Sequence, residues 1–370
     1  MSAAAPEAAE APELHRMTTK PRSSRTRVTP SERLAKLLRR LVTIPGYAMA
    51  CLLAIASAPL WVPAAAGVDR VRRNGGVALR SGVFVTFYLV CELAGLAISA
   101  GLWLLRPILR WDAEHWSRLH YRLQDAWGTS LLSAAVRLFD LRVEIEERGA
   151  GPGESGARLD EGPYLLLVRH ASTGDTLLAS ALVGRPHGIR LRYVLKRELL
   201  WDPCLDVVGN RLPHVFVDRA PDDSRREIAR VQALASDLSS HDAVLIYPEG
   251  TRFSEAKRSR VLARLAREGD VKPLEYARSL HSVLPPRSGG VLGLLEAAPF
   301  ADVVVCAHTG FEGAATLAQI WRGELLHATI RMRFQRFPRA SIPISRDAQA
   351  DWLRECWQQI DAWLASQRAR

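Results

Sequence analysis

Two long apolar stretches near the N-terminus restrict the possible folds of this chain more than any other feature of its sequence. Residues 41–66 contain no charged side chain, and residues 81–105 contain only Glu92. Each stretch exceeds the ~20 residues that a helix needs to cross the hydrocarbon core of a bilayer. Uncharged runs of this length are rare in soluble cores, so we interpret 41–105 as two hydrophobic membrane segments rather than as buried core helices. Three prolines predict that the first is kinked or re-entrant, and we expect Glu92 to face the partner helix.

The charges that flank these segments predict their orientation. Residues 1–40 contain nine Lys or Arg and four acids, and we interpret them as a basic disordered tail. By the positive-inside rule this tail stays in the cytoplasm, and two crossings return the rest of the chain to the same side. Four arginines between residues 67 and 80 argue against full translocation and favour a shallow hairpin as the alternative. We therefore predict a membrane protein, multi-pass or hairpin-anchored, with its main domain facing the cytoplasm.

Residues 106–140 are predicted to form interfacial or linker helices. Within them, Trp116, Leu119 and Leu123 share one helical face and have arginines beside them. Tryptophan and arginine in this arrangement suit a helix that lies in the membrane interface. A helix packed on the following domain explains the pattern equally well.

From residue 141 onward the pattern changes to an α/β domain. The chain is 48% hydrophobic and 24% charged, a globular composition that excludes disorder as its main state. Short apolar runs alternate with helical stretches, which predicts an α/β domain over 141–370. An amphipathic helix at 347–366 closes it. The runs that we predict to be strands are 141–147, 164–168, 189–195, 214–217, 243–247, 302–306 and 326–334.

A histidine and an aspartate follow the predicted strand at 164–168. Five residues separate His170 from Asp175, and in a continuous helix two such side chains would diverge. If His170 lies in the turn and Asp175 in the first helical turn, the carboxylate reaches the imidazole. An Asp on one ring nitrogen fixes the tautomer and raises the basicity of the other nitrogen, as a general base requires. Alone, such a pair near a strand end is more often incidental.

Three further polar clusters follow predicted strands or turns. After 243–247 the chain reads Glu249-Gly250-Thr251-Arg252, in which the Arg252 guanidinium, the Thr251 hydroxyl and the turn amides are suited to grip a phosphate. The strand at 214–217 leads to Arg219, and two prolines precede Arg287. Four polar clusters of this kind in one domain are poorly explained as solvated surface.

Several kinds of function are disfavoured by what the sequence lacks. The five cysteines include no CxxC pair, so neither a zinc site nor a disulfide framework is predicted. There is no GxSxG elbow, so a covalent serine nucleophile is unsupported. The net charge of +11 attracts phosphate surfaces, either nucleic acid or anionic lipid. Without an aromatic-basic platform or a helix-turn-helix pattern, we expect no nucleic-acid partner.

Here the sequence resembles the glycerolipid acyltransferases, the superfamily of the 1-acyl-glycerol-3-phosphate (lysophosphatidate) acyltransferases. His170 to Asp175 matches its HX4D motif, and Glu249 to Arg252 its EGTR motif. The VFVDR stretch ending at Arg219 resembles the second block of the family, and LPPRSGG, which contains Arg287, resembles the fourth. Order and separations agree over about residues 160–310. PEGTRFSEAKR followed by LPPRSGG is especially similar to the branch of eukaryotic lysophosphatidate and lysocardiolipin acyltransferases.

The resemblance implies a glycerolipid-acyltransferase-like mixed sheet flanked by helices, behind a two-segment membrane hairpin. It implies acyl transfer from acyl-CoA, or from acyl carrier protein as the alternative donor, to a lysophospholipid in the membrane, first of all lysophosphatidate. His170 would be the general base and Asp175 its orienting partner. No cofactor and no metal are expected. The residues implied in substrate binding are Arg219, Glu249, Gly250, Thr251, Arg252 and Arg287, the last on either the acceptor phosphate or CoA.

Two departures from the family and two alternative functions accompany this reading. Many members have Asn before the motif His, where this chain has Arg169. Asp218 beside Arg219 would oppose anion binding unless it points away. Another lysophospholipid, glycerol 3-phosphate or a non-phosphate alcohol is the alternative acceptor, and a catalytically silent lipid-binding adaptor is the alternative class. The basic helix predicted at 254–269 is either a solvated face or a contact for anionic lipid or CoA phosphates.

Overall fold

The computed structural model describes residues 30–149, 156–172, 174–218, 224–314 and 316–368. The chain divides into two units, residues 1–39 and 40–370, and the described part of the first is the beginning of a helix. The helices are α1 (Pro30–Ala56), α2 (Ala58–Arg72), α3 (Val77–Leu109), α4 (Ala113–Phe139), α5 (Asp175–Ala179), α6 (Arg185–His187), α7 (Pro203–Val208), α8 (Ser224–Gln232), α9 (Glu255–Glu268), α10 (Val271–Ser279), α11 (Ser288–Ala297), α12 (Leu317–Arg322) and α13 (Arg346–Arg368). The strands are β1 (Arg142–Arg148), β2 (Tyr164–Val168), β3 (Arg190–Lys196), β4 (Val215–Val217), β5 (Asp242–Ile246), β6 (Asp302–Thr309) and β7 (Thr329–Phe337).

The predicted basic tail is described only from Pro30 onward, where α1 has already begun. Residues 30–40 are therefore helical, although we expected a disordered tail up to residue 40. Residues 1–29 lie outside the described part of the chain.

The seven strands form one mixed sheet in the order β1-β7-β6-β2-β5-β3-β4. Strands β2, β3, β4, β5 and β6 run parallel, β7 is antiparallel to β6, and β1 is parallel to β7. The mixed α/β fold and all seven predicted strands are confirmed, with ends that differ by at most three residues. Because β2 lies at the centre, all five of its side chains are buried, which explains its unbroken apolar sequence.

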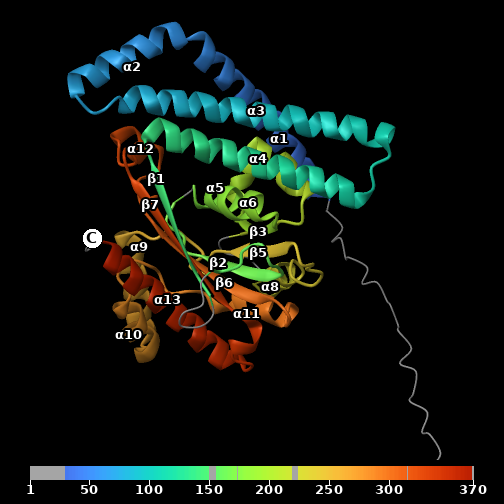
Figure 1. The fold of residues 1–370 in the computed structure, drawn as a ribbon, viewed down its shortest axis with the longest axis vertical. Helices are drawn as coiled ribbons and strands as arrows, with labels where there is room; N and C mark the ends of the chain where they lie inside the picture. Colours follow the sequence, from blue (N-terminus) through green and yellow to red (C-terminus); the bar gives the residue numbers. More distant parts are fainter. Residues whose placement is uncertain (1–29, 150–155, 173, 219–223, 315, 369–370) are drawn as a thin grey trace, which may run out of the picture. The chain divides into compact units, whose positions relative to one another are not determined.

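Helices cover both faces of this sheet. Successive side chains of a strand point to opposite faces, so Leu166 packs in one core with Phe139 of α4, together with side chains from α5. Leu165 and Leu167 pack in the other core with Trp357 of α13, together with side chains of α8 and α11. The sheet therefore lies between an α4–α5 layer and an α8–α11–α13 layer (Figure 1).

The predicted helix between 106 and 140 is α4, and it packs on the α/β domain. Asp112 caps its N-terminus, because the backbone N–H of His115 donates to Asp112 Oδ1 at 2.7 Å. Tyr121 and Leu123 are buried against residues of α7 and the turn after it. Helix α3 lies along the other side of α4 (Figure 1), so α4 is a layer shared by the N-terminal helices and the sheet.

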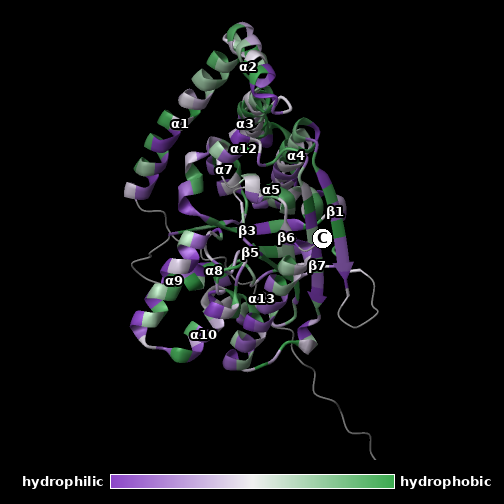
Figure 2. Ribbon diagram, turned by 90° about the vertical axis from the view of Figure 1, so that its left-hand side faces the viewer, coloured by the Kyte–Doolittle hydropathy of each residue, from purple (hydrophilic) through white to green (hydrophobic). Residues whose placement is uncertain are grey.

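Helices α1 and α3 are long and apolar enough to cross a membrane, and only 11% and 17% of their most apolar stretches are buried. They are therefore not core helices of the described fold, and Figure 2 shows many apolar residues along α1. The predicted kink in 41–66 is a break at Ser57 between α1 and α2. Pro59 stands in the first turn of α2, where a proline removes no helical hydrogen bond.

The expectation that Glu92 faces its apolar partner helix is wrong. Glu92 is fully buried and points to the α/β side, where its Oε1 accepts from Trp127 Nε1 at 2.9 Å and its Oε2 accepts from the backbone N–H of Cys204 at 3.0 Å. Two further contacts join α3 to the same part of the α/β domain. The Tyr88 hydroxyl donates to Asp202 Oδ2 at 2.7 Å, and Arg211 donates to the carbonyl of Ser99 in α3 at 2.6 Å. The polar groups of α3 thus hold the α/β domain.

Candidate active site

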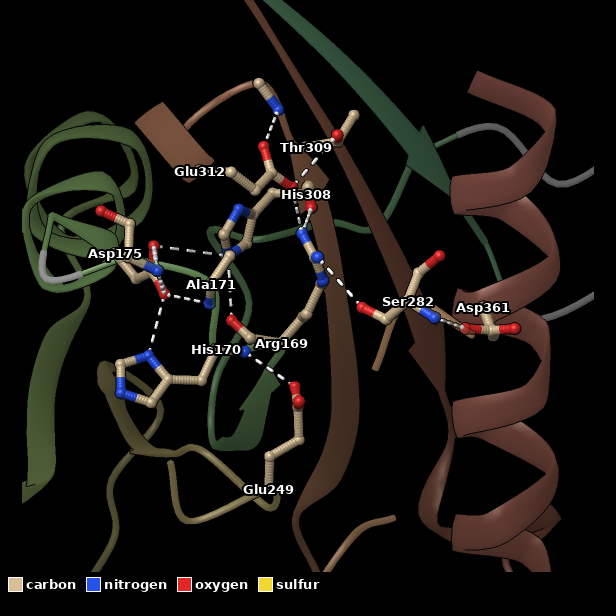
Figure 3. A network of polar contacts seen from close by, with 12 residues as sticks. Arg169, His170, Ala171, Asp175, Glu249, Ser282, His308, Thr309, Glu312 and Asp361 are labelled. Atoms are coloured by element: carbon tan, nitrogen blue, oxygen red, sulfur yellow. Dashed lines mark hydrogen bonds and ion pairs between the residues drawn. The ribbon is translucent and has the colours of Figure 1, made fainter. Parts of the chain in front are cut away.

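The turn after β2 brings His170 and Asp175 together as the motif predicts. Asp175 is the first residue of α5, and its carboxylate accepts from the backbone N–H groups of Ala171 and Ser172 at 2.8–3.0 Å. These contacts bend the chain back on itself. As a result Nδ1 of His170 lies 2.9 Å from Oδ2 of Asp175. Because a carboxylate only accepts, Nδ1 carries the proton, and the lone pair of Nε2 lies on the far side of the ring (Figure 3).

The surroundings of His170 favour its neutral form. Burial lowers the pKa of His170 below its ordinary 6.5, and the charges of Lys196 and Arg252 lower it further, while Asp175 acts in the opposite direction. The imidazole also lies against the ring of Tyr247, with 4.5 Å between the ring centroids. A neutral imidazole that is held at Nδ1 is prepared to accept a proton at Nε2.

Glu249 joins three segments of the site. Its Oε1 accepts from the backbone N–H of His170 and its Oε2 from that of Leu284, both at 2.9 Å. Burial raises the pKa of Glu249 to about 7, against the opposing effects of Arg169 and of the two amides. The first and third motifs are joined again where the N–H of Phe253 donates to the carbonyl of His170. Both carboxylate oxygens of Glu249 therefore serve the turns themselves.

Gly250 leaves space that the side chain of Arg287 occupies. Gly250 has φ +67°, a left-handed conformation that favours glycine, and a Cβ at this position would lie 3.3 Å from Nε of Arg287. The backbone N–H of Arg287 donates to the carbonyl of Pro248 at 2.8 Å. The guanidinium of Arg287 thus lies against the turn that contains Thr251 and Arg252. The structure brings together the residues predicted from the third and fourth motifs.

The Thr251 hydroxyl is engaged by a residue that sequence reasoning did not single out. Lys257, in the first turn of α9, donates from Nζ to Thr251 Oγ1 at 3.0 Å and to the carbonyl of Arg252 at 2.8 Å. The N-cap Ser254 begins this helix, since its hydroxyl accepts from the N–H of Lys257. The only sequence signal was the general basic character of the helix.

Arg169, the departure from the family pattern, is a buried support beneath the His170 turn. Its guanidinium donates to the carbonyl of His308 at 2.6 Å, to Glu312 Oε1 at 2.7 Å and to the carbonyl of Ser282 at 3.1 Å. Figure 3 shows this network continuing from Ser282 to Asp361 of α13. Its position directly after a buried strand was the signal for a structural arginine.

Of the two predicted residues after β4, Arg219 and Asp218, the structure describes only Asp218. Arg219 lies outside the described residues. The carboxylate of its neighbour Asp218 lies 3.0 Å from the guanidinium of Arg197. The negative charge that we expected to oppose anion binding is therefore paired with a cation. Among the described residues, no three His, Cys, Asp or Glu side chains are grouped as a metal site would need.

The comparisons with known proteins agree with this geometry. Residues 144–309 match a protein family described as Acyltransferase. The matches confirm the resemblance to the glycerolipid acyltransferases.

The individual relatives have more specific descriptions than the family. The chain is 26% identical over 291 residues to 1-acyl-sn-glycerol-3-phosphate acyltransferase gamma of Homo sapiens, which covers 78% of this chain and 71% of the relative. The same enzyme of Mus musculus gives 26% over 296 residues. The delta enzyme of Homo sapiens is 25% identical over 174 residues, which is 46% of this chain and 44% of the relative. No solved structure matches the chain.

Proposed function

We propose that this protein transfers an acyl chain from acyl-CoA to the free hydroxyl of lysophosphatidate and so makes phosphatidate. The observation that carries the proposal is the 2.9 Å contact between His170 Nδ1 and Asp175, in a domain whose relatives are 1-acyl-sn-glycerol-3-phosphate acyltransferases. Neither family membership nor a His–Asp contact would suffice alone.

In the proposed reaction His170 acts as the general base. Its Nε2 removes the proton from the acceptor hydroxyl as the oxygen attacks the thioester carbonyl carbon. A C–O bond forms and the C–S bond breaks, and the imidazolium returns its proton to the departing CoA sulfur. Asp175 holds the ring and stabilises the imidazolium that forms between these two steps. No covalent enzyme intermediate is required.

The cations around His170 are proposed to hold the phosphate of the acceptor. Arg252 and Lys196 lie close enough to shift the titration of His170, and Arg219 is assigned to the same phosphate on its motif position. Thr251 and Gly250 shape the turn. We assign Glu249 to positioning, because its two oxygens accept the amides of His170 and Leu284. Placing a hydroxyl and a thioester together in this way lowers the barrier by several kcal/mol.

We further propose that residues 41–105 anchor the protein in a membrane, as a multi-pass segment or a shallow hairpin, with residues 141–370 on the cytoplasmic side. The apolar exposure of α1 and α3 supports the anchor. Arg70, Arg72 and Arg73 at the end of α2 support the cytoplasmic orientation, since they would resist transfer across the bilayer. Acyl-CoA then approaches from the cytoplasm and the lysophospholipid from the bilayer.

The test is transfer from radiolabelled acyl-CoA by the purified, detergent-solubilised full chain, against a panel of lysophospholipids and glycerol 3-phosphate. His170→Ala is the control. We expect a phosphatidate product that depends on His170. Transfer to a different acceptor would keep the mechanism and replace the substrate. Transfer only from acyl carrier protein would replace the donor, and no transfer by folded protein would contradict the proposal.

A further inference from the structure

A second concavity lies beside the His170 turn. It is a cavity of about 730 Å³ whose walls come from α9, α10, the segment 284–288 and α13. This volume falls within the range of about 300–1,000 Å³ that is typical of small-molecule sites. His170 and Asp175 are not among its lining residues.

The cavity shares a wall with the candidate active site. Glu249, Thr251 and Arg287 all line it. Since Glu249 also accepts the backbone N–H of His170, a single carboxylate separates the cavity wall from the turn that carries the proposed base. A ligand in the cavity therefore lies next to the turn that carries His170.

The cavity carries more positive than negative charge. Its cations are Arg264, Lys272, Arg287 and Arg354, and its acids are Glu249, Asp351 and Glu355. Asp351 pairs with Arg354, and Glu249 accepts two backbone amides. Among the residues that the structure describes, the Lys272 ammonium and the Arg287 guanidinium have neither an ion pair nor a hydrogen bond. These two cations of the cavity lining are thus available to an anion. Arg264 pairs with Glu268 at 3.5 Å, and because both side chains are largely exposed, this weak pair can give way to a phosphate.

The inner walls are apolar and one of them is aromatic. Leu265 and Leu353 are buried there, and Pro273 and Pro285 add flat, rigid surface. The Tyr276 hydroxyl donates to the carbonyl of Arg354 at 3.0 Å, which holds its ring in place. A lining that combines apolar, aromatic and cationic side chains is complementary to a heterocyclic base that carries phosphate groups.

The cavity lies away from the apolar helix α3. Helix α3 packs on the α4 side of the sheet, whereas α13, which forms one wall of the cavity, covers the opposite face. Figures 1 and 2 both show α9 and α10 at the end of the domain away from α3. On the proposed attachment, a ligand reaches this cavity from the water side rather than from the bilayer.

We propose that this cavity binds the phosphorylated nucleotide end of the acyl donor, with Arg264 and Lys272 holding its phosphates, while the thioester end extends past Glu249 to His170. The inference rests on the proposed function, since it takes acyl-CoA as the donor. It assigns to the basic helix α9 a role that its sequence left open between lipid and CoA.

Kinetics with two donors test this proposal. The variant is Arg264→Glu in α9 with Lys272→Glu in α10. The matched control is Arg260→Glu/Arg267→Glu, which reverses two charges of α9 outside the cavity. We expect the KM for acyl-CoA to rise about tenfold or more in the variant and to stay unchanged in the control. The KM for S-acyl-pantetheine, which lacks the nucleotide, and the KM for the acceptor should not change. An equal rise for both donors, or an equal rise in the control, overturns the assignment.

Binding of free CoA separates this inference from the proposed function. The dissociation constant is measured on full-length, detergent-solubilised His170→Ala protein, with and without the two cavity substitutions. Loss of CoA binding only when the cavity is altered supports the site, even if the wild-type protein transfers no acyl group to any acceptor. Binding that is unaffected by the cavity substitutions, or no binding of CoA at all, overturns the inference.

Discussion

Helix α3 and the central strand β2 bury opposite kinds of side chain. Strand β2 hides five apolar residues in a row, whereas α3 exposes Ile98, Trp103 and Ile108 and hides Glu92 and Ser99. A soluble domain gains free energy by removing apolar surface from water. Helix α3 does not follow this rule over most of its length, but its buried polar groups bind the domain below. The difference indicates that α3 is suited to an apolar environment and the sheet domain to water. The polar contacts of Tyr88, Glu92 and Ser99 in α3, here called the seam, join the two regions.

The largest expected effect is on catalysis and comes from a substitution in the α/β domain. His170→Ala removes the proposed base, so the rate of acyl transfer should fall by about 10²- to 10⁴-fold. Association with membranes should stay unchanged, because His170 does not contact α1 or α3. Rates are measured in detergent and association by flotation with liposomes. Retained turnover would remove His170 as the base, and loss of flotation would show that the two regions are not separable.

The next effect falls on the seam. Glu92→Ala leaves the buried N–H groups of Trp127 and Cys204 unpaired, each at a cost of about 1–3 kcal/mol. The melting temperature in detergent should therefore decrease, with a smaller decrease for Glu92→Gln, which keeps one acceptor. Ile98→Ala, on the exposed face of the same helix, is the matched control. Equal effects of Glu92→Ala and Ile98→Ala would mean that the seam does not hold the domain.

A smaller effect is expected when the turns of the site lose one contact. In Glu249→Gln an amide nitrogen replaces one of the two acceptors, which should decrease the free energy of unfolding by about 1–3 kcal/mol and lower kcat. The pH dependence is a second readout. Because burial raises the pKa of Glu249 from 4.5 to about 7, its contribution to stability is complete below pH 4.5 and is lost as the pH rises through 7. Glu249→Gln should remove this component from the stability curve.

The smallest effect is a shift in a pH profile. The neutral imidazole is the active form, so kcat/KM should rise with pH through the pKa of His170, which lies below 6.5. Arg252 lowers that pKa, so Arg252→Ala should move this limb to higher pH. Arg260→Ala, a solvent-exposed arginine of α9, should leave the limb in place. A shift toward lower pH in Arg252→Ala would contradict the proximity of the two groups.

Much of this architecture could be predicted from local sequence. The seven strands follow from apolar runs of limited length, and the approach of Asp175 to His170 follows from their places in a turn and in a first helical turn. The prediction that Glu92 faces the partner helix was wrong, because its actual partners Trp127 and Cys204 come from segments far along the chain. The role of Glu249 and the engagement of Thr251 by Lys257 also depend on how separate turns meet. Periodicity describes one element at a time and does not report such contacts.

The position of α4 between α3 and the sheet has a consequence for how the enzyme would meet its acceptor. Packed helices keep their axes about 8–10 Å apart, and α5, whose first residue is Asp175, packs directly on α4. The height of the reacting edge above the anchoring helices is therefore set by packed backbone layers rather than by a flexible tether. On the proposed attachment, a lysophospholipid would have to rise to a fixed height above the membrane surface. The packed helices, rather than the lipid, would set that height.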